Sequence, residues 1–298
     1  VRLVGSEMCI RDSSYTAMIP SLPPSTGPIG VFDSGYGGLT ILDKIRGLMP
    51  EYDYIYLGDS ARCPYGPRSF EVVYEFTLQA VSKLFELGCP LVILACNTAS
   101  AKALRTIQQI NLPVIDATRR VLGVIRPTAE CIGEITRSRH VGILATAGTI
   151  KSESYLLEIH KLSPDIVVTG EACPMWVSLV ENNEYQSEGA DYFVKQHINR
   201  LLDKDPMIDT IILGCTHYPL LLDKIRQFTP GHIRIIAQGE YVARSLQDYL
   251  NRHPEMDARC EKGGKCRFLT TESENKFEES ASIFLGRQDI KVESIALE

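Results

Sequence analysis

The chain has 298 residues, enough to bury a substantial core and to form two domains. Its composition, 44% hydrophobic and 23% charged, is typical of a globular protein. The net charge of −6 argues against nucleic acid as a partner, because nucleic-acid-binding domains are usually basic. No apolar run approaches the roughly 18 residues of a membrane span, so we expect no membrane partner either.

The nine cysteines are odd in number and scattered. A chain of this length does not need disulfides for stability, and scattered free thiols favour a reducing compartment, so we expect a cytoplasmic protein. No Cys-x-x-Cys pair indicates zinc, and we expect no metal site.

Residues 1–27 look foreign to the fold, since the first twelve show no periodicity and the rest are rich in Ser, Pro and Thr. No secretory signal is apparent, and Met18 is a candidate natural start. We expect this leader to be disordered or non-native, with the fold beginning at Pro28.

A short strand then leads through a glycine-rich turn into a helix over residues 39–48. Thr40 occupies the last glycine position of the dinucleotide pattern, and the phosphate-binding loop ending is missing too. The helix start still suits a small anion such as a carboxylate. Asp33 and Ser34 stand at the strand end, where Asp33 is either a turn former or a group that receives an ammonium or orients a thiol.

The next strand, residues 54–59, ends at Asp59 and is followed by a loop rich in Pro and Gly over 61–68, of a kind that often completes a pocket. An amphipathic helix over 71–87 leads to the apolar strand 91–95. Cys96 follows at the start of a helix that we expect over 99–109. A helix start favours a thiolate, although most unpaired cysteines are simply buried apolar residues.

The remaining elements continue the alternation of strand and helix. We expect strands at 113–116, 141–146, 166–169, before Cys215, at 233–239 and at 267–271, and helices from 118, over 151–162, 191–202, 220–228, 240–250 and 277–285. This pattern predicts a doubly wound α/β fold with mainly parallel sheets. The closing elements are expected to return to the first domain.

Two halves of the chain resemble each other. Cys215 ends an apolar strand as Cys96 does, 119 residues later, and a hydroxyl residue and His217 follow it. Two other landmarks recur in the same order at offsets of 110 and 112 residues. If the halves face each other, the two thiols could address one substrate from opposite sides.

Five motifs, taken together and in order, resemble the glutamate racemase family: they span residues 32–39, 62–68, 95–99, 145–152 and 213–219. The resemblance implies two pseudo-symmetric doubly wound α/β domains, with the active site in the cleft between them. By position we expect a first domain of residues 28–117 plus 237–298 and a second of residues 118–236. It also implies interconversion of L- and D-glutamate for bacterial cell-wall peptidoglycan, with no cofactor.

The resemblance further implies roles for individual residues. Cys96 and Cys215 match the two acid/base thiols, His217 assists Cys215 with Glu181 behind it, and Asp33, with possible support from Asp59, assists Cys96. The substrate-binding positions are Asp33, Ser34, Tyr65, Gly66, Asn97, Thr98, Thr149, Thr216 and His217. We expect glutamate as the small-molecule substrate, and a homodimer or a monomer–dimer equilibrium.

Other interpretations remain open. A relative of the same architecture could racemise another acidic amino acid such as aspartate, and pocket depth would decide between them. More remote alternatives are a cysteine hydrolase using Cys215 and His217, or an amino-acid-binding protein. A hydrolase would leave Cys96 without a purpose, and a binding protein needs neither thiol.

Overall fold

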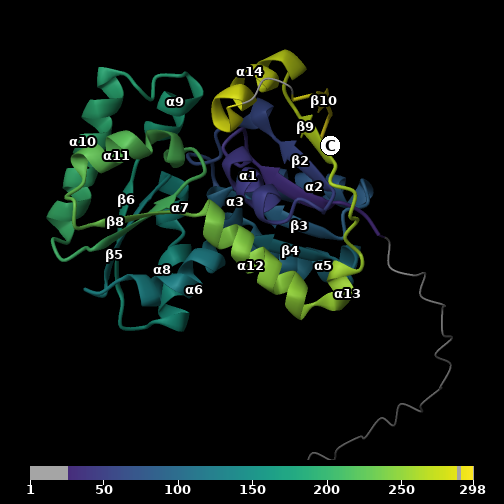
Figure 1. The fold of residues 1–298 in the computed structure, drawn as a ribbon, viewed down its shortest axis with the longest axis horizontal. Helices are drawn as coiled ribbons and strands as arrows, with labels where there is room; N and C mark the ends of the chain where they lie inside the picture. The colour runs from purple at the N-terminus through teal and green to yellow at the C-terminus, as the bar shows by residue number, and fades with distance from the viewer. Residues whose placement is uncertain (1–25, 287–289, 298) are drawn as a thin grey trace, which may run out of the picture.

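The computed structural model describes residues 26–286 and 290–297. Two parallel sheets lie side by side, each flanked by helices (Figure 1). The first sheet has the order β10-β9-β2-β1-β3-β4 and the second the order β6-β5-β7-β8, with parallel pairing throughout both. The predicted α/β class is confirmed.

The strands of the first sheet are β1 (Ile29–Asp33), β2 (Tyr54–Gly58), β3 (Leu91–Leu94), β4 (Arg120–Gly123), β9 (Cys266–Thr270) and β10 (Val292–Ser294). Those of the second are β5 (His140–Ala145), β6 (Val167–Ala172), β7 (Thr210–Gly214) and β8 (Arg234–Ala237). The central strands β1, β3 and β7 are buried along their whole length, which is why they are continuous apolar runs in the sequence.

The helices around the first sheet are α1 (Leu39–Leu48), α2 (Phe70–Glu86), α3 (Asn97–Lys102), α4 (Leu104–Thr106), α5 (Leu112–Ile115), α12 (Gly239–Arg252), α13 (Pro254–Asp257) and α14 (Glu274–Leu285), with a 3₁₀ turn at Ser60–Arg62 and a π turn at Ile107–Asn111. Those around the second are α6 (Ile125–Ile135), α7 (Ala147–Lys151), α8 (Ser154–Leu162), α9 (Trp176–Glu181), α10 (Glu188–Lys204) and α11 (Leu222–Phe228), with a 3₁₀ turn at Tyr218–Leu221. Side-chain caps at Ser69 and Ser187 start the two longest, α2 and α10.

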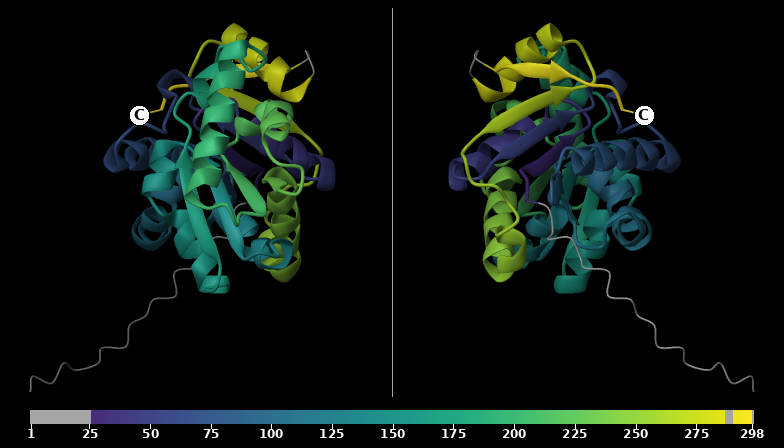
Figure 2. Two further views of the ribbon diagram at one scale, coloured as in Figure 1. Left: turned by 90° about the vertical axis from the view of Figure 1, so that its left-hand side faces the viewer. Right: turned by 90° about the vertical axis from the view of Figure 1, so that its right-hand side faces the viewer.

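The chain crosses between the sheets twice. It leaves the first sheet after β4 into α6, and it returns after β8 through α12, which packs along α1. The C-terminal strands β9 and β10, yellow in Figure 2, complete the first sheet next to β2. The predicted return of the closing elements to the first sheet is confirmed.

Two predicted elements near this crossing are wrong. Residues 113–116 were expected to form a strand, but α5 occupies Leu112–Ile115, where Pro113 suits a first helical turn and Val114 is 86% exposed. Where a helix was expected from Thr118, the chain instead forms β4, which pairs with β3 on the side away from β1. The helix that crosses to the second sheet, α6, begins only at Ile125. Residues 120–123 therefore belong to the first sheet, although the predicted boundary assigns them to the second domain.

The predicted leader falls largely outside the described residues, which begin at Thr26. Gly27 forms a bridge with Cys260, and its amide donates to the Arg259 carbonyl at 2.9 Å. The regular structure therefore starts one residue before the expected Pro28.

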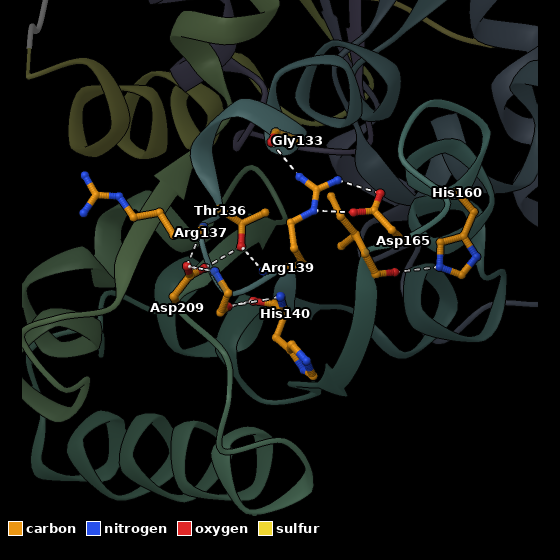
Figure 3. A network of polar contacts seen from close by, with 10 residues as sticks. Gly133, Thr136, Arg137, Arg139, His140, His160, Asp165 and Asp209 are labelled. Carbon is orange, nitrogen blue, oxygen red and sulfur yellow. Dashed lines mark hydrogen bonds and ion pairs between the residues drawn. The ribbon is translucent and has the colours of Figure 1, made fainter.

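The amino ends of β5 and β7 are fixed by a polar network (Figure 3). The Asp209 carboxylate accepts from the hydroxyl of Thr136 and from the amides of Arg137 and Ser138, all at 2.7 Å. Arg139, which has a positive φ of 65°, donates to both oxygens of Asp165 at 2.6 Å. This network holds the α6–β5 connection at the edge of the sheet opposite to Cys215.

Candidate active site

Cys96 lies after β3 and caps the start of α3. The amide of Ala99 donates to its sulfur at 3.4 Å, and the Ser34 hydroxyl lies 3.3 Å from the same sulfur. Burial, together with the charges of Asp33 and Cys215, raises the pKa of the Cys96 thiol to about 12, against the two hydrogen bonds, which lower it. Cys96 is therefore a neutral thiol at neutral pH.

Asp33 connects the two halves of the site. It ends β1 and is fully buried; it accepts the amide of Gly35 at 3.0 Å and the hydroxyl of Thr216, which follows β7, at 3.4 Å. Burial raises the pKa of the Asp33 carboxyl, against the opposing charge of His217. A residue from the first sheet thus touches the segment that carries the second thiol.

Cys215 lies after β7 with a histidine beside it. The Nδ1 atom of His217 is 3.9 Å from the sulfur, and Nε2 is 3.0 Å from Oε1 of Glu181 at the end of α9. Burial alone would lower the pKa of His217, but hydrogen bonds with Cys215 and Glu181 outweigh it and raise the pKa to about 10. His217 is therefore an imidazolium at neutral pH, held between the Cys215 sulfur and the Glu181 carboxylate.

Threonines from both sheets meet where α3 and α7 begin. The hydroxyl of Thr98 lies 3.0 Å from that of Thr146 and 3.4 Å from that of Thr149. The amide of Gly148 also donates to the Gly66 carbonyl at 3.0 Å. Two helix starts therefore converge with several hydroxyls, a setting suited to a carboxylate.

The glycine-rich turn after β1 packs directly on the second thiol's loop. A Cβ atom on Gly37 would lie 2.4 Å from Oγ1 of Thr216 and 2.5 Å from Nδ1 of His217. Only glycine permits this close approach. The glycine-rich turn therefore packs the first sheet's loop against the loop that follows β7.

Comparison with known proteins places this site in a family. Residues 40–246, more than half of the chain, match the family model described as Asp/Glu/Hydantoin racemase. The chain belongs to this racemase family. It is thus an enzyme of the isomerase class, and the predicted resemblance is confirmed.

Individual racemases align over nearly the whole chain. A glutamate racemase from Bacillus cereus is 39% identical over 271 residues, covering 91% of this chain and 97% of that protein. A solved glutamate racemase from Bacillus anthracis has a TM-score of 0.82 at 35% identity, covering 93% of this chain and 99% of that one. Another, from Francisella tularensis in complex with D-glutamate, has a TM-score of 0.80 at 31% identity, with the same coverage.

Two residues predicted from the racemase motifs, Asp59 and Tyr65, are bonded to each other. The carboxylate of Asp59 accepts the phenol of Tyr65, Nε of Arg62 at 2.7 Å and the hydroxyl of Thr271 at 2.8 Å; these contacts do not include Cys96. Tyr65 is buried against the rings of Phe32 and Phe76. Its hydroxyl is engaged by Asp59, so this side chain fixes the loop over residues 61–68 to the end of β2.

The motifs did not single out every residue near the racemase thiols. Cys63 donates its thiol to Oε1 of Glu181 at 3.0 Å, the same oxygen that His217 contacts, and burial raises its pKa well above the usual value. Cys63 lies in the family-like motif over residues 62–68, but the sequence assigned it no role of its own. Tyr155 and Gln238, which bond to Asn97, were not noticed at all, because buried polar partners from distant elements leave no local pattern.

Neither metal ligands nor membrane helices are found in the described part of the chain. Residues 26–286 and 290–297 contain no group of three or more His, Cys, Asp or Glu side chains placed to hold a metal ion. Within the same residues, no helix has both the length and the apolarity to cross a membrane.

Proposed function

We propose that the chain interconverts L- and D-glutamate without a cofactor, by moving the α-proton between Cys96 and Cys215. The observation that carries this proposal is the pairing of two strand-end thiols, one from each sheet: Ser34 lies 3.3 Å from the Cys96 sulfur, and its neighbour Asp33 accepts from Thr216, the residue after Cys215. Inverting an α-carbon requires a proton to leave one face and another to arrive on the opposite face, and two such groups satisfy that requirement.

In each turnover one proton is removed from the α-carbon and one is delivered to it. One cysteine, as thiolate, removes the α-proton and becomes a thiol, leaving a carbanion at the α-carbon. The other, as thiol, delivers its proton to the opposite face and becomes a thiolate. Cys96 supplies the neutral thiol, and the His217 imidazolium, 3.9 Å from the Cys215 sulfur, stabilises the negative charge that the reaction places there. Each direction of reaction exchanges the two roles.

The remaining site residues are proposed to bind glutamate and to support the thiols. Ser34, Asn97, Thr98, Thr149, Thr216 and the backbone of Tyr65 and Gly66 supply hydrogen bonds, while Asp33 receives the ammonium group or orients Cys96. Glu181 holds the imidazolium of His217. General acid–base catalysis contributes about 10² to 10⁴-fold per group, so oriented donors at the helix starts must stabilise the carbanion as well.

The test is to incubate the protein with L-glutamate, and separately with L-aspartate, in D₂O, and to follow optical rotation and α-deuterium. We expect racemisation of glutamate with no added cofactor, and loss of about 10³-fold or more in Cys96→Ser and in Cys215→Ser. Full activity in either single variant would refute the two-thiol assignment. Preference for aspartate would favour the alternative acidic amino-acid racemase.

We also propose a biological setting and an assembly. The D-glutamate would supply bacterial peptidoglycan, and a strain that requires D-glutamate should grow without it when this chain is expressed. The chain is proposed to form two domains around the cleft and to associate as a homodimer or in a monomer–dimer equilibrium. Ile110 and Val114, 62% and 86% exposed, offer apolar surface for such a contact, and sedimentation measures the outcome.

A further inference from the structure

Three buried side chains form a closed ring of hydrogen bonds between the two sheets. Asn97 donates from Nδ2 to Oε1 of Gln238 at 2.7 Å, Gln238 donates from Nε2 to the Tyr155 hydroxyl at 2.6 Å, and Tyr155 donates to Oδ1 of Asn97 at 2.7 Å. All three are at most 3% exposed. Each member donates once and accepts once around the ring, so the bonds polarise one another in the same sense.

The ring ties together both places where the chain crosses between the sheets. Gln238 lies on the return crossing, between β8 and α12. Its Nε2 also reaches the carbonyl of Val124 and the hydroxyl of Thr128, both at 3.1 Å, and these residues belong to the outgoing crossing. A single amide thus joins the two connections about which the sheets could move.

The hydrogen-bonded ring of side chains also contacts the backbone next to each of the two thiols. Asn97 follows Cys96 directly. On the other side, a Cβ atom on Gly214 would lie 3.1 Å from Cε2 of Tyr155, so the tyrosine ring lies against the residue before Cys215. Burial, with the charge of Cys215 adding to it, raises the pKa of Tyr155 far above its usual value, so its hydroxyl stays a donor.

We propose that Tyr155 and Gln238 are positioning residues for the racemase: they orient Asn97 and hold the loops of Cys96 and Cys215 at their working separation. Neither residue lies within the five family-like motifs. The inference rests on the proposed roles of the two thiols, and it adds that their spacing is set from within the protein by a buried ring.

The first experiment removes one hydroxyl. Tyr155→Phe keeps the ring packed on Gly214 and should lower kcat/KM for glutamate about tenfold, the equivalent of roughly one buried hydrogen bond. Tyr54→Phe is the matched control, since Tyr54 is equally buried and donates to the Met49 carbonyl at 2.8 Å, in the core of the first sheet. It should leave kcat/KM within about twofold while losing a similar bond.

The second experiment asks whether the ring acts as a unit and through Asn97. Tyr155→Phe is combined with Gln238→Met, and separately with Asn97→Ala. We expect Tyr155→Phe to cost less than about twofold when it is added to Gln238→Met or to Asn97→Ala, because the ring is already broken in both. If the two costs multiply in both pairs, or if Tyr155→Phe costs no more than Tyr54→Phe, the proposal is overturned.

Failure here can be told apart from failure of the proposed function. These variants retain both cysteines, so their relative rates can be compared whichever group transfers the proton. An active Cys96→Ser or Cys215→Ser variant would remove the two-thiol mechanism. Multiplicative costs with inactive cysteine variants would remove only the positioning role of the ring.

Discussion

The two thiols occupy equivalent places in the two sheets but have different partners. Cys96 lies beside Ser34 and the charge of Asp33, in surroundings that raise its pKa to about 12. Cys215 lies beside the imidazolium of His217, which Glu181 supports. The internal repeat therefore places the two sulfurs at equivalent strand ends. Their neighbours are not repeated, so Cys96 lies near the carboxylate of Asp33 and Cys215 lies beside the cation of His217.

This difference teaches where asymmetry can appear in a racemase. L- and D-glutamate have the same free energy in water, so kcat/KM must be equal in the two directions for the natural enzyme and for every variant. A change at one thiol can lower kcat/KM only equally in the two directions, while it also changes which proton transfer is slow. Isotope effects measured separately from L-glutamate and from D-glutamate therefore distinguish the two thiols, whereas kcat/KM values do not.

The largest expected effect comes from removing the cation. His217→Asn should lower kcat/KM about 10² to 10³-fold, equally in both directions, because negative charge on Cys215 loses its partner. In this variant, proton transfer through Cys215 becomes the slower step. Removal of the α-deuterium by Cys215 is then more rate-limiting than in the natural enzyme, and its removal by Cys96 is less rate-limiting. With α-deuterated L- and D-glutamate, the isotope effect should rise for one enantiomer and fall for the other.

The matched control is His160→Asn, which removes a histidine whose Nε2 lies 2.8 Å from the carbonyl of Ile166, the residue before β6. It should leave the rate and both isotope effects unchanged. Isotope effects that moved in the same direction for both enantiomers in His217→Asn would show that His217 serves the two thiols alike.

The next effect comes from removing the carboxylate on the other side. Asp33→Asn should lower the pKa of the Cys96 thiol, since the Asp33 charge is one cause of its rise, and should lower kcat about tenfold. The ultraviolet absorbance of the thiolate between pH 8 and 12, with Asp33→Asn/Cys96→Ser as the reference, measures the shift. Asp53→Asn, at a surface turn, is the control.

An unchanged thiol titration in Asp33→Asn would contradict the electrostatic link between the two residues. A lost activity with that unchanged titration would instead assign Asp33 to substrate binding alone.

Much of this comparison could be predicted from the sequence, because the signals are local. Apolar runs ending in Cys96 and Cys215 marked the strand ends, and the helix over 39–48 has the predicted bounds. The error from Thr118 arose where tertiary pairing overrode a local pattern, since β4 forms only by bonding to β3, whereas the error at 113–116 missed a helical turn that Pro113 suits. No local signal could reveal Cys63, Tyr155 or Gln238, whose partners are more than 50 residues away in the chain.

A smaller effect is expected from the third cysteine of the site. Cys63→Ala removes one of the two donors to Oε1 of Glu181 and should lower kcat/KM about threefold, whereas Cys63→Ser keeps a hydroxyl donor and should stay near the natural rate. Cys131→Ala, which removes a thiol that donates to the nearby Thr128 carbonyl at 3.2 Å, is the control. Equal losses in Cys63→Ser and Cys63→Ala would mean that the thiol fills space rather than orienting Glu181.

The smallest expected effect on activity lies at the other end of β7, and it separates stability from catalysis. Asp209 precedes this strand and Cys215 follows it. In Asp209→Asn an amide nitrogen would face the two backbone amides that Oδ2 now accepts, so we expect a loss of about 1 to 3 kcal/mol in the free energy of unfolding. Racemisation should stay within about twofold, because the chemistry lies at the opposite edge of the sheet.

The stability lost in Asp209→Asn should depend on pH, because the pKa of Asp209 differs between the folded and unfolded chain. Partial burial raises the pKa of Asp209, but hydrogen bonds from Thr136, Ser138 and Arg137 outweigh it and hold the pKa well below its usual range. A folded-state pKa below the unfolded value of about 3.9 contributes stability above that pH, which is lost as the pH falls towards the folded value. Urea unfolding should therefore show a larger difference between Asp209→Asn and the natural chain at pH 7 than at pH 3. A parallel loss of racemisation at pH 7 would show that the two ends of β7 are mechanically coupled, and that the geometry at Cys215 depends on the whole strand.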